Sequence, residues 1–203
     1  MEQPIPFFYD VTLRDGNQAL AKPWNNAEKE KVFLQLLKLG VQGVEVGFAA
    51  ASDMDFESWK GIAQLTASMA AKGDVAAQSV AVASLARANK VDIQRAFEAI
   101  QYAPKPRIHT FIAVSKFSME HVLKMSPEQV REKAVESVTF AKSLLQGRGD
   151  VQFSAEHFGD SLDNMEFVIS LLKEVVDAGA TTINLPNTVE RYRPMLYVEQ
   201  VRQ

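Results

Sequence analysis

The chain has 203 residues, of which 47% are hydrophobic and 23% are charged, a composition typical of one globular domain with a sizeable core. Its formal net charge of −3 lacks the basic excess that binding to nucleic acid or to an anionic membrane requires. Because these residues include no cysteine, a disulfide framework, a thiolate zinc site and a cysteine nucleophile are excluded, and carboxylate, imidazole or other oxygen ligands would have to hold a metal.

The first residues, Met1 to Pro4, contain neither the basic nor the apolar segment of a secretory signal. No window of the sequence approaches the ~18 apolar residues that a membrane span needs. We therefore expect a cytoplasmic protein with small-molecule partners and with neither a membrane nor a nucleic acid as partner.

Apolar segments of strand length alternate with segments of helical periodicity along the whole chain. The first strand ends near Tyr9, and the next helix begins at Asn25 or Asn26 and stops at Gly40. The later strands are predicted at 41–48, 75–82, 107–114, 151–156 and 181–186, and the later helices at 55–71, 86–99, 126–145, 165–178 and 189–203.

Six strand-helix units in this order predict an α/β fold with a parallel sheet and right-handed crossovers. A closed (β/α)8 barrel typically needs ~250 residues, so the chain is about two units too short for one. The periodicity fits a doubly wound open sheet equally well. No Gly-x-Gly-x-x-Gly string and no P-loop string supports a nucleotide-binding fold of that kind.

A polar cluster follows the first strand and contains Asp10, Arg14, Asp15 and Gly16. Neighbours on an extended strand point to opposite faces, so Arg14 and Asp15 can reach one pocket only if the strand ends there and Gly16 lets the chain turn. A hard metal ligand would then lie beside a cation suited to a developing oxyanion. The alternative interpretation is an ordinary salt-bridge cluster on the protein surface.

The string Leu13-Arg14-Asp15-Gly16-Asn17-Gln18 resembles the first-strand signature of the metal-dependent aldolase-like TIM barrels. This family includes the isopropylmalate, citramalate and homocitrate synthases and hydroxymethylglutaryl-CoA lyase, and the run from Asp15 to Leu20 is most similar to its isopropylmalate synthase branch. The resemblance implies a TIM (β/α)8 barrel, of which this chain supplies about the first six strand-helix units. Residues 1–203 would then be the N-terminal part of a single catalytic domain.

Later strands end in polar residues that resemble further motifs of the family. His109, on the fourth predicted strand, matches a histidine near the substrate, although a lone histidine on an apolar strand is as well explained as a hydrogen-bonded core residue. Ser154 and Glu156 are two apart on the fifth strand and therefore share one face. Thr188 follows the sixth strand, where the resemblance implies a hydrogen bond to the carboxylate of a keto acid.

The resemblance implies an acyltransferase that performs a Claisen-type condensation of acetyl-CoA, as co-substrate, with a 2-keto acid. The keto acid expected is 2-oxoisovalerate, which gives 2-isopropylmalate in leucine biosynthesis, and the expected assembly is a homodimer. A divalent metal ion, Mg, Mn or Zn, would act as Lewis acid and template. The implied roles are metal ligand for Asp15, catalytic residues for Arg14 and Glu156, and substrate binding for Gln18, His109, Ser154 and Thr188.

The sequence also departs from the family pattern. The family completes its metal site with a His-x-His pair, and none of the three histidines here has that spacing. Asn187 and Glu190 stand where many members have aspartate and glycine, and Glu45 is either a carboxylate satisfied inside the barrel or a residue with a direct role. We therefore expect this chain alone to be inactive. The alternatives are another synthase of the family, for citramalate or homocitrate, a lyase that runs the reverse cleavage, and an inactive barrel module.

Overall fold

Strands that follow one another in the chain lie next to one another in the sheet. The computed structural model describes residues 6–190 and 193–203, and in it the strands have the order β1-β2-β3-β4-β5-β6. Every neighbouring pair is parallel. The strands are β1 (Tyr9–Asp10), β2 (Gly43–Phe48), β3 (Ala81–Arg87), β4 (Pro106–Ala113), β5 (Asp150–Glu156) and β6 (Thr182–Asn184).

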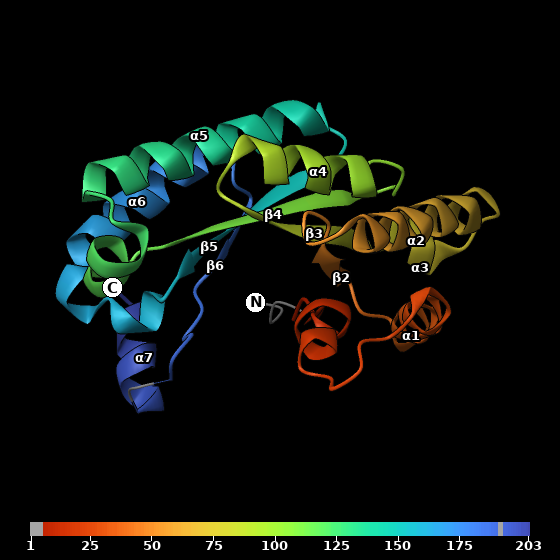
Figure 1. Ribbon diagram of the computed structural model, residues 1–203, viewed down its shortest axis with the longest axis horizontal. Helices are drawn as coiled ribbons and strands as arrows, with labels where there is room; N and C mark the ends of the chain where they lie inside the picture. Colours follow the sequence, from red (N-terminus) through yellow and green to blue (C-terminus); the bar gives the residue numbers. More distant parts are fainter. Residues whose placement is uncertain (1–5, 191–192) are drawn as a thin grey trace, which may run out of the picture.

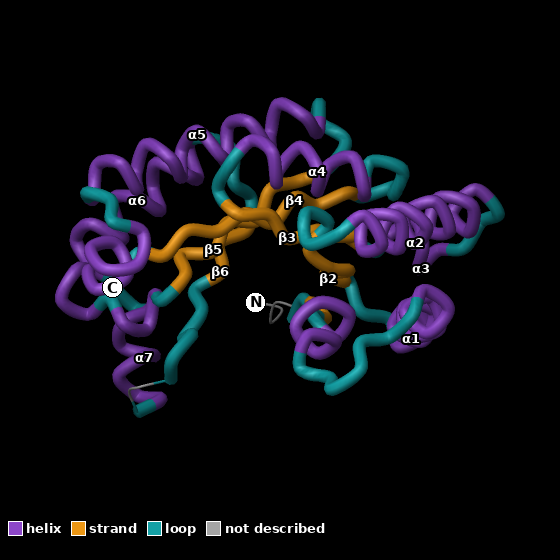
Figure 2. Tube along the Cα trace, viewed as in Figure 1, coloured by secondary structure: helices purple, strands orange, loops and turns teal. Residues whose placement is uncertain are grey.

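The helices that connect these strands lie on the outer side of a curved sheet, which makes the chain an arch (Figure 1). Figure 2 shows the strands along the inner side of this arch and the helices around them. Helices on one face only are incompatible with a doubly wound sheet, and the predicted half-barrel of six strand-helix units is confirmed. The helices are α1 (Asn26–Leu39), α2 (Asp53–Ala71), α3 (Val75–Ser79), α4 (Lys90–Ile100), α5 (Pro127–Leu145), α6 (Met165–Asp177) and α7 (Pro194–Val201).

Alternation along β4 illustrates how the two faces of the sheet differ. Ile108 and Ile112 are buried in the apolar core between the sheet and the helices. His109 and Phe111 point to the opposite, inner face, where they line a cavity. The inner face of the arch therefore carries the polar residues, while the outer face of the sheet packs against the helices.

Side chains that cap the helices explain where two of them begin. Asn25 accepts a hydrogen bond from the backbone N–H of Glu28 at 3.0 Å, and the Glu28 carboxylate accepts one from the backbone N–H of Asn25 at 2.8 Å. Ser126 and Gln129 form the same reciprocal arrangement at the start of α5, with proline at the first helical position. Both predicted helix starts are confirmed.

The third predicted strand, 75–82, is wrong in its first half. Its first five residues form the short helix α3, and β3 extends to Arg87, so the helix predicted at 86–99 begins only at Lys90. The cause is local capping, because the side chains of Asp74 and Asn89 each accept a hydrogen bond at 2.9 Å from the backbone N–H three residues later.

The helix predicted at 189–203 is also shorter in the structure. Val189 and Glu190 are not helical, residues 191 and 192 lie outside the described part, and α7 begins at Pro194. Among the described residues, none of the helices combines the length and the apolar character that crossing a bilayer demands.

Candidate active site

The chain leaves β1 through a short helical turn, Thr12–Gly16, that carries two charged residues. Asp10 starts the turn, because its carboxylate accepts two hydrogen bonds from Thr12. The backbone N–H of Thr12 donates at 2.9 Å and its hydroxyl group at 3.0 Å. The turn brings Arg14 and Asp15 together, with Nη1 of Arg14 2.8 Å from Oδ1 of Asp15. The strand ends here as predicted, and Gly16 is the last residue of the turn, which it closes without a positive φ.

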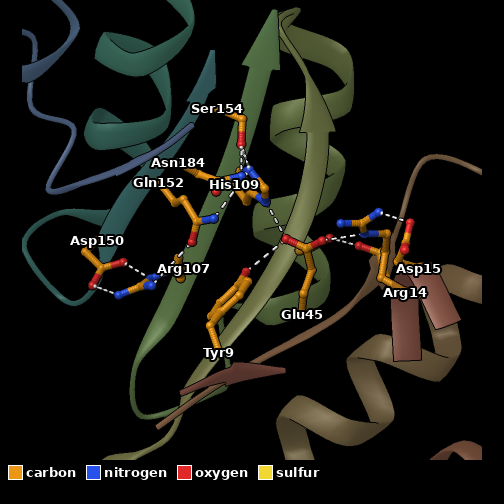
Figure 3. Close-up of polar contacts among 12 residues, drawn as sticks. Tyr9, Arg14, Asp15, Glu45, Arg107, His109, Asp150, Gln152, Ser154 and Asn184 are labelled. Atoms are coloured by element: carbon orange, nitrogen blue, oxygen red, sulfur yellow. Dashed lines mark hydrogen bonds and ion pairs between the residues drawn. The ribbon is translucent and has the colours of Figure 1, made fainter. Parts of the chain in front are cut away.

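Glu45 of β2 is fully buried and accepts hydrogen bonds from three side chains (Figure 3). Its Oε1 accepts from Nε of Arg14 at 2.5 Å, and its Oε2 accepts from the hydroxyl of Tyr9 at 2.9 Å and from Nδ1 of His109. Of the two interpretations left open for Glu45, the structure favours a satisfied internal carboxylate. It lies behind the cavity and contacts two of the residues that line it.

The charges around Glu45 determine its ionisation. Burial alone raises the pKa of the Glu45 carboxyl group, but the charge and hydrogen bond of His109, followed by those of Arg14, outweigh burial and hold the pKa at about 2 instead of 4.5. Glu45 is therefore a carboxylate at neutral pH. Because a carboxylate can only accept hydrogen bonds, Nδ1 of His109 carries a hydrogen.

A chain of hydrogen bonds continues from His109 to the next two strands. Nε2 of His109 lies 2.6 Å from the hydroxyl oxygen of Ser154, which also accepts from the side-chain amide of Asn184 at 2.8 Å. The parallel register explains this contact, because Ser154 of β5 lies directly beside Asn184 of β6. The amide nitrogen of Gln152, also on β5, lies 3.5 Å from the same imidazole nitrogen.

Arg14, His109, Ser154 and Asn184 line a cavity of about 360 Å³ on the inner face of the arch, at the carboxyl ends of the strands. Six of the seven predicted site residues line it, and the seventh, Gln18, is exposed and is not part of the lining. The substrate-binding role predicted for Gln18 thus has no support from the cavity. The lining consists of Arg14, Asp15, Leu85, His109, Phe111, Ser154, Glu156, Asn184, Pro186 and Thr188.

Thr188 reaches the cavity from the loop after β6. Its hydroxyl oxygen accepts a hydrogen bond from the backbone N–H of His157 at 3.1 Å, which ties this loop to the loop after β5. Since the oxygen is the acceptor in that bond, the hydroxyl hydrogen is available to a ligand. Thr188 is exposed, whereas Ser154 is buried, so the two hydroxyl groups lie at different depths of the cavity.

The donors and the apolar walls together indicate what the cavity can bind. A guanidinium, two hydroxyls and an amide suit a ligand with carboxylate or carbonyl oxygens. Leu85, Phe111 and Pro186 add an apolar wall that suits an alkyl group. An oxygen-rich acid with a small apolar side chain satisfies both requirements.

The described residues supply at most part of a divalent metal site. Asp15 has a 67% exposed side chain and lines the cavity, so its carboxylate is accessible to a cation. Between residues 6 and 190 and from 193 to 203, however, no three histidine or acidic side chains converge to hold an ion. One carboxylate leaves an octahedral cation mostly to water, so these residues do not by themselves fit a divalent metal ion.

Phe111, Asn184 and Tyr9 are among the residues at the site that had no role in the sequence predictions. Phe111 has a visible sign in the sequence, because it lies two positions after His109 and therefore on the same face of β4. Asn184 lies on the sixth predicted strand, but no role was predicted for it. Tyr9 shows no local sign at all, because its contact with Glu45 joins two strands 36 residues apart.

Half of a parallel barrel, with charged and hydroxyl side chains gathered where its strands end, defines a protein of the TIM-barrel class with its site in the usual place. Comparison with protein families agrees and is more specific. The model of the HMGL-like family matches residues 6–203, and the chain belongs to this family.

Curated relatives are similar over nearly the whole chain. A protein of Leptospira interrogans serogroup Icterohaemorrhagiae serovar Lai (strain 56601), named 2-isopropylmalate synthase 2, is 50% identical over 98% of this chain and 44% of its own length. A 2-isopropylmalate synthase of Dechloromonas aromatica (strain RCB) is 43% identical over 100% of this chain and 36% of its own length. The chain thus spans less than half of these two relatives.

Solved structures share the fold at low sequence identity. The HMG-CoA lyase of Bacillus subtilis superposes with a TM-score of 0.73 at 16% identity, over 100% of this chain and 65% of that one. The hydroxymethylglutaryl-CoA lyase of Pseudomonas aeruginosa gives a TM-score of 0.70 at 21% identity, over 97% of this chain and 62% of that one. These likenesses establish the architecture alone.

Proposed function

We propose that the protein to which these residues belong is an acyltransferase that condenses acetyl-CoA with a 2-keto acid. The keto acid proposed is 2-oxoisovalerate and the product 2-isopropylmalate. The observation that carries the proposal is the shared cavity of Arg14, His109, Ser154 and Thr188, whose donors suit the oxygens of a keto acid. The relative that is 50% identical and named 2-isopropylmalate synthase 2 supports the choice of reaction within the family.

In the proposed reaction a base removes a proton from the acetyl methyl group, and the resulting enolate attacks the keto carbon. The alkoxide that forms takes up a proton, and hydrolysis of the thioester releases CoA. Arg14, whose side chain is 20% exposed, is the cation that we assign to the developing negative charge. Glu156 is the second proposed catalytic residue, and we assign the base to none of the described residues.

Substrate binding is assigned to residues on two strands and on the loop after β6. His109 and Ser154 would hold the keto acid from the floor of the cavity, and Thr188 would donate to its carboxylate from the loop above. Gln18 belongs to this proposal only through the resemblance. A divalent cation, with Asp15 as one ligand, would supply Lewis-acid chemistry when bound.

The proposal includes the setting of the site. Residues 1–203 are taken as the N-terminal part of one catalytic barrel domain, in a cytoplasmic homodimer. A relative in Arabidopsis thaliana that is 45% identical is named 2-isopropylmalate synthase 2, chloroplastic. The names of the two bacterial relatives give no location. Fractionation of the source cells with an antibody against this chain would test the location.

The experiment is a steady-state assay of the complete protein. Release of free CoA from acetyl-CoA is measured with a panel of 2-keto acids, and cleavage of hydroxymethylglutaryl-CoA is measured in parallel. We expect condensation with the highest kcat/KM for 2-oxoisovalerate. Cleavage without condensation would replace the proposal by a lyase, and neither activity, together with no calorimetric binding of Mg2+, Mn2+ or Zn2+, would replace it by an inactive barrel module.

A further inference from the structure

Tyr9 contacts the site from behind, without lining the cavity. It lies on β1, and its ring packs closely on β2, where a Cβ added at Gly43 would lie 2.6 Å from Cδ2 of the ring. The guanidinium carbon of Arg107 lies 5.7 Å from the centre of the same ring. These contacts hold the ring itself, so they would survive the removal of the hydroxyl group.

The hydroxyl of Tyr9 has a separate partner. It donates to Oε2 of Glu45, the oxygen that also accepts from His109, while Arg14 donates to the other oxygen (Figure 3). The terminal torsion of a glutamate is broad and roughly twofold, so its donors decide the plane of the carboxylate. Three donors on two oxygens determine the plane of the Glu45 carboxylate. That plane in turn determines the positions of Arg14 and His109, the two donors that reach the cavity.

We propose that Tyr9 is a positioning residue, whose hydroxyl holds the Glu45 carboxylate in the orientation that aims Arg14 and His109 into the cavity. This inference rests on the proposed function, because it assigns a role within the same site. It also predicts that the effect of Tyr9 passes through Glu45 and not through direct contact with a substrate.

The surroundings keep the hydroxyl in its donor form. Burial, followed by the negative charge of Glu45, raises the pKa of Tyr9 well above its usual value of 10. The phenol therefore stays protonated over the whole range in which an enzyme is assayed. Its hydrogen bond to a buried carboxylate is charge-assisted, which is the stronger kind.

The first test is Tyr9→Phe in the complete protein, with Tyr102→Phe as matched control. The control removes the same hydroxyl group from an exposed tyrosine. We expect Tyr9→Phe to lower kcat about tenfold with less change in the KM for the keto acid, because misaimed groups affect the transition state most. Wild-type kcat and KM in Tyr9→Phe would overturn the inference.

The second test combines Tyr9→Phe with Glu45→Gln in a double-mutant cycle. If the hydroxyl acts through the carboxylate, Tyr9→Phe should lower kcat by less than about threefold once Glu45 is already replaced. A purely structural role would lower kcat by the same factor in both backgrounds. That result would also overturn the inference.

A third measurement does not depend on the activity. In protein labelled with 15N-histidine, Tyr9→Phe should shift the imidazole resonances of His109 and leave those of the exposed His121 unchanged. Unchanged resonances of His109 would contradict the role of Tyr9. A wild-type protein that condenses no keto acid would contradict the proposed function alone, and the shift at His109 would still decide the inference.

Discussion

Arg14 makes two contacts at once, because its Nε donates to the buried Glu45 while its Nη1 pairs with the exposed Asp15. The guanidinium therefore spans the boundary between the interior and the cavity. A lysine would keep the positive charge that compensates Glu45, but a single ammonium group cannot reproduce the planar fork. Replacing Arg14 by lysine thus separates its role in the cavity from its electrostatic compensation of Glu45.

We predict that Arg14→Lys in the complete protein lowers kcat about 100-fold and leaves the free energy of unfolding within about 1 kcal/mol of wild type. Steady-state kinetics and denaturant unfolding measure the two quantities. Arg148→Lys, at an exposed position far along the chain, is the control and should change neither. A fully active Arg14→Lys enzyme would remove Arg14 from the proposed mechanism.

The low pKa of Glu45 predicts how stability depends on pH. The folded pKa of about 2 lies below the value of 4.5 for a free carboxyl group, so the unfolded chain binds the proton more readily. The stabilisation is complete above about pH 4.5 and is lost as the pH falls towards 2. We expect the difference in unfolding free energy between wild type and Glu45→Gln to shrink over this window, as measured by urea unfolding. A difference that stays constant from pH 6 to pH 2 would contradict it.

At the scale of elements, β2 and α2 meet at a glycine. The register of β2 shifts between Glu45 and Gly47, and a Cβ added at Gly47 would overlap the ring of Trp59. Trp59 is almost fully buried and belongs to the core. The missing side chain at Gly47 thus lets the helix approach the strand closely.

Gly47→Ala should therefore destabilise the protein by about 1–3 kcal/mol, since the core must move to accept the methyl group. Gly61→Ala is a matched control on α2, where an added Cβ meets nothing within 4 Å. This control should be neutral or stabilising by up to about 1 kcal/mol, because alanine favours a helix interior. Thermal and denaturant unfolding measure the stability of the two variants. Equal changes in the free energy of unfolding would show that the contact with Trp59 does not determine the effect of Gly47→Ala.

Sequence patterns predicted most of the elements whose cause is local. The cap at Ser126 and the alternation along β4 depend on residues within a few positions of each other. Asp74 was also a local sign, but the apolar run after it suited a strand equally well, and α3 was missed. The contact of Tyr9 with Glu45 could not be predicted, because strand register depends on packing between distant segments.

For the molecule as a whole, β1 and β6 are the ends of the strand order and have one strand neighbour each. Phe8, directly before β1, has a 62% exposed side chain. Parallel sheets are normally buried on both faces, and open edges favour association with other chains. The edges of this arch at β1 and β6 are accordingly surfaces that need covering.

We predict that residues 1–203 expressed alone self-associate and show no release of CoA that depends on a keto acid. The reasons are the two open edges and the single candidate metal ligand among the described residues. Light scattering gives the mass, and a thiol assay with the complete protein as positive control gives the activity. A monomer of residues 1–203 that performs the condensation would contradict both reasons.

The match between strand order and chain order also matters while the protein is being made. A nascent chain leaves the ribosome from its N-terminus, and here each new strand finds the strand just synthesised as its template. Contacts between neighbouring units need no segment that is still to be translated, which keeps loop closure short and assembly stepwise. The sheet can thus grow at one edge during translation, one strand and one helix at a time.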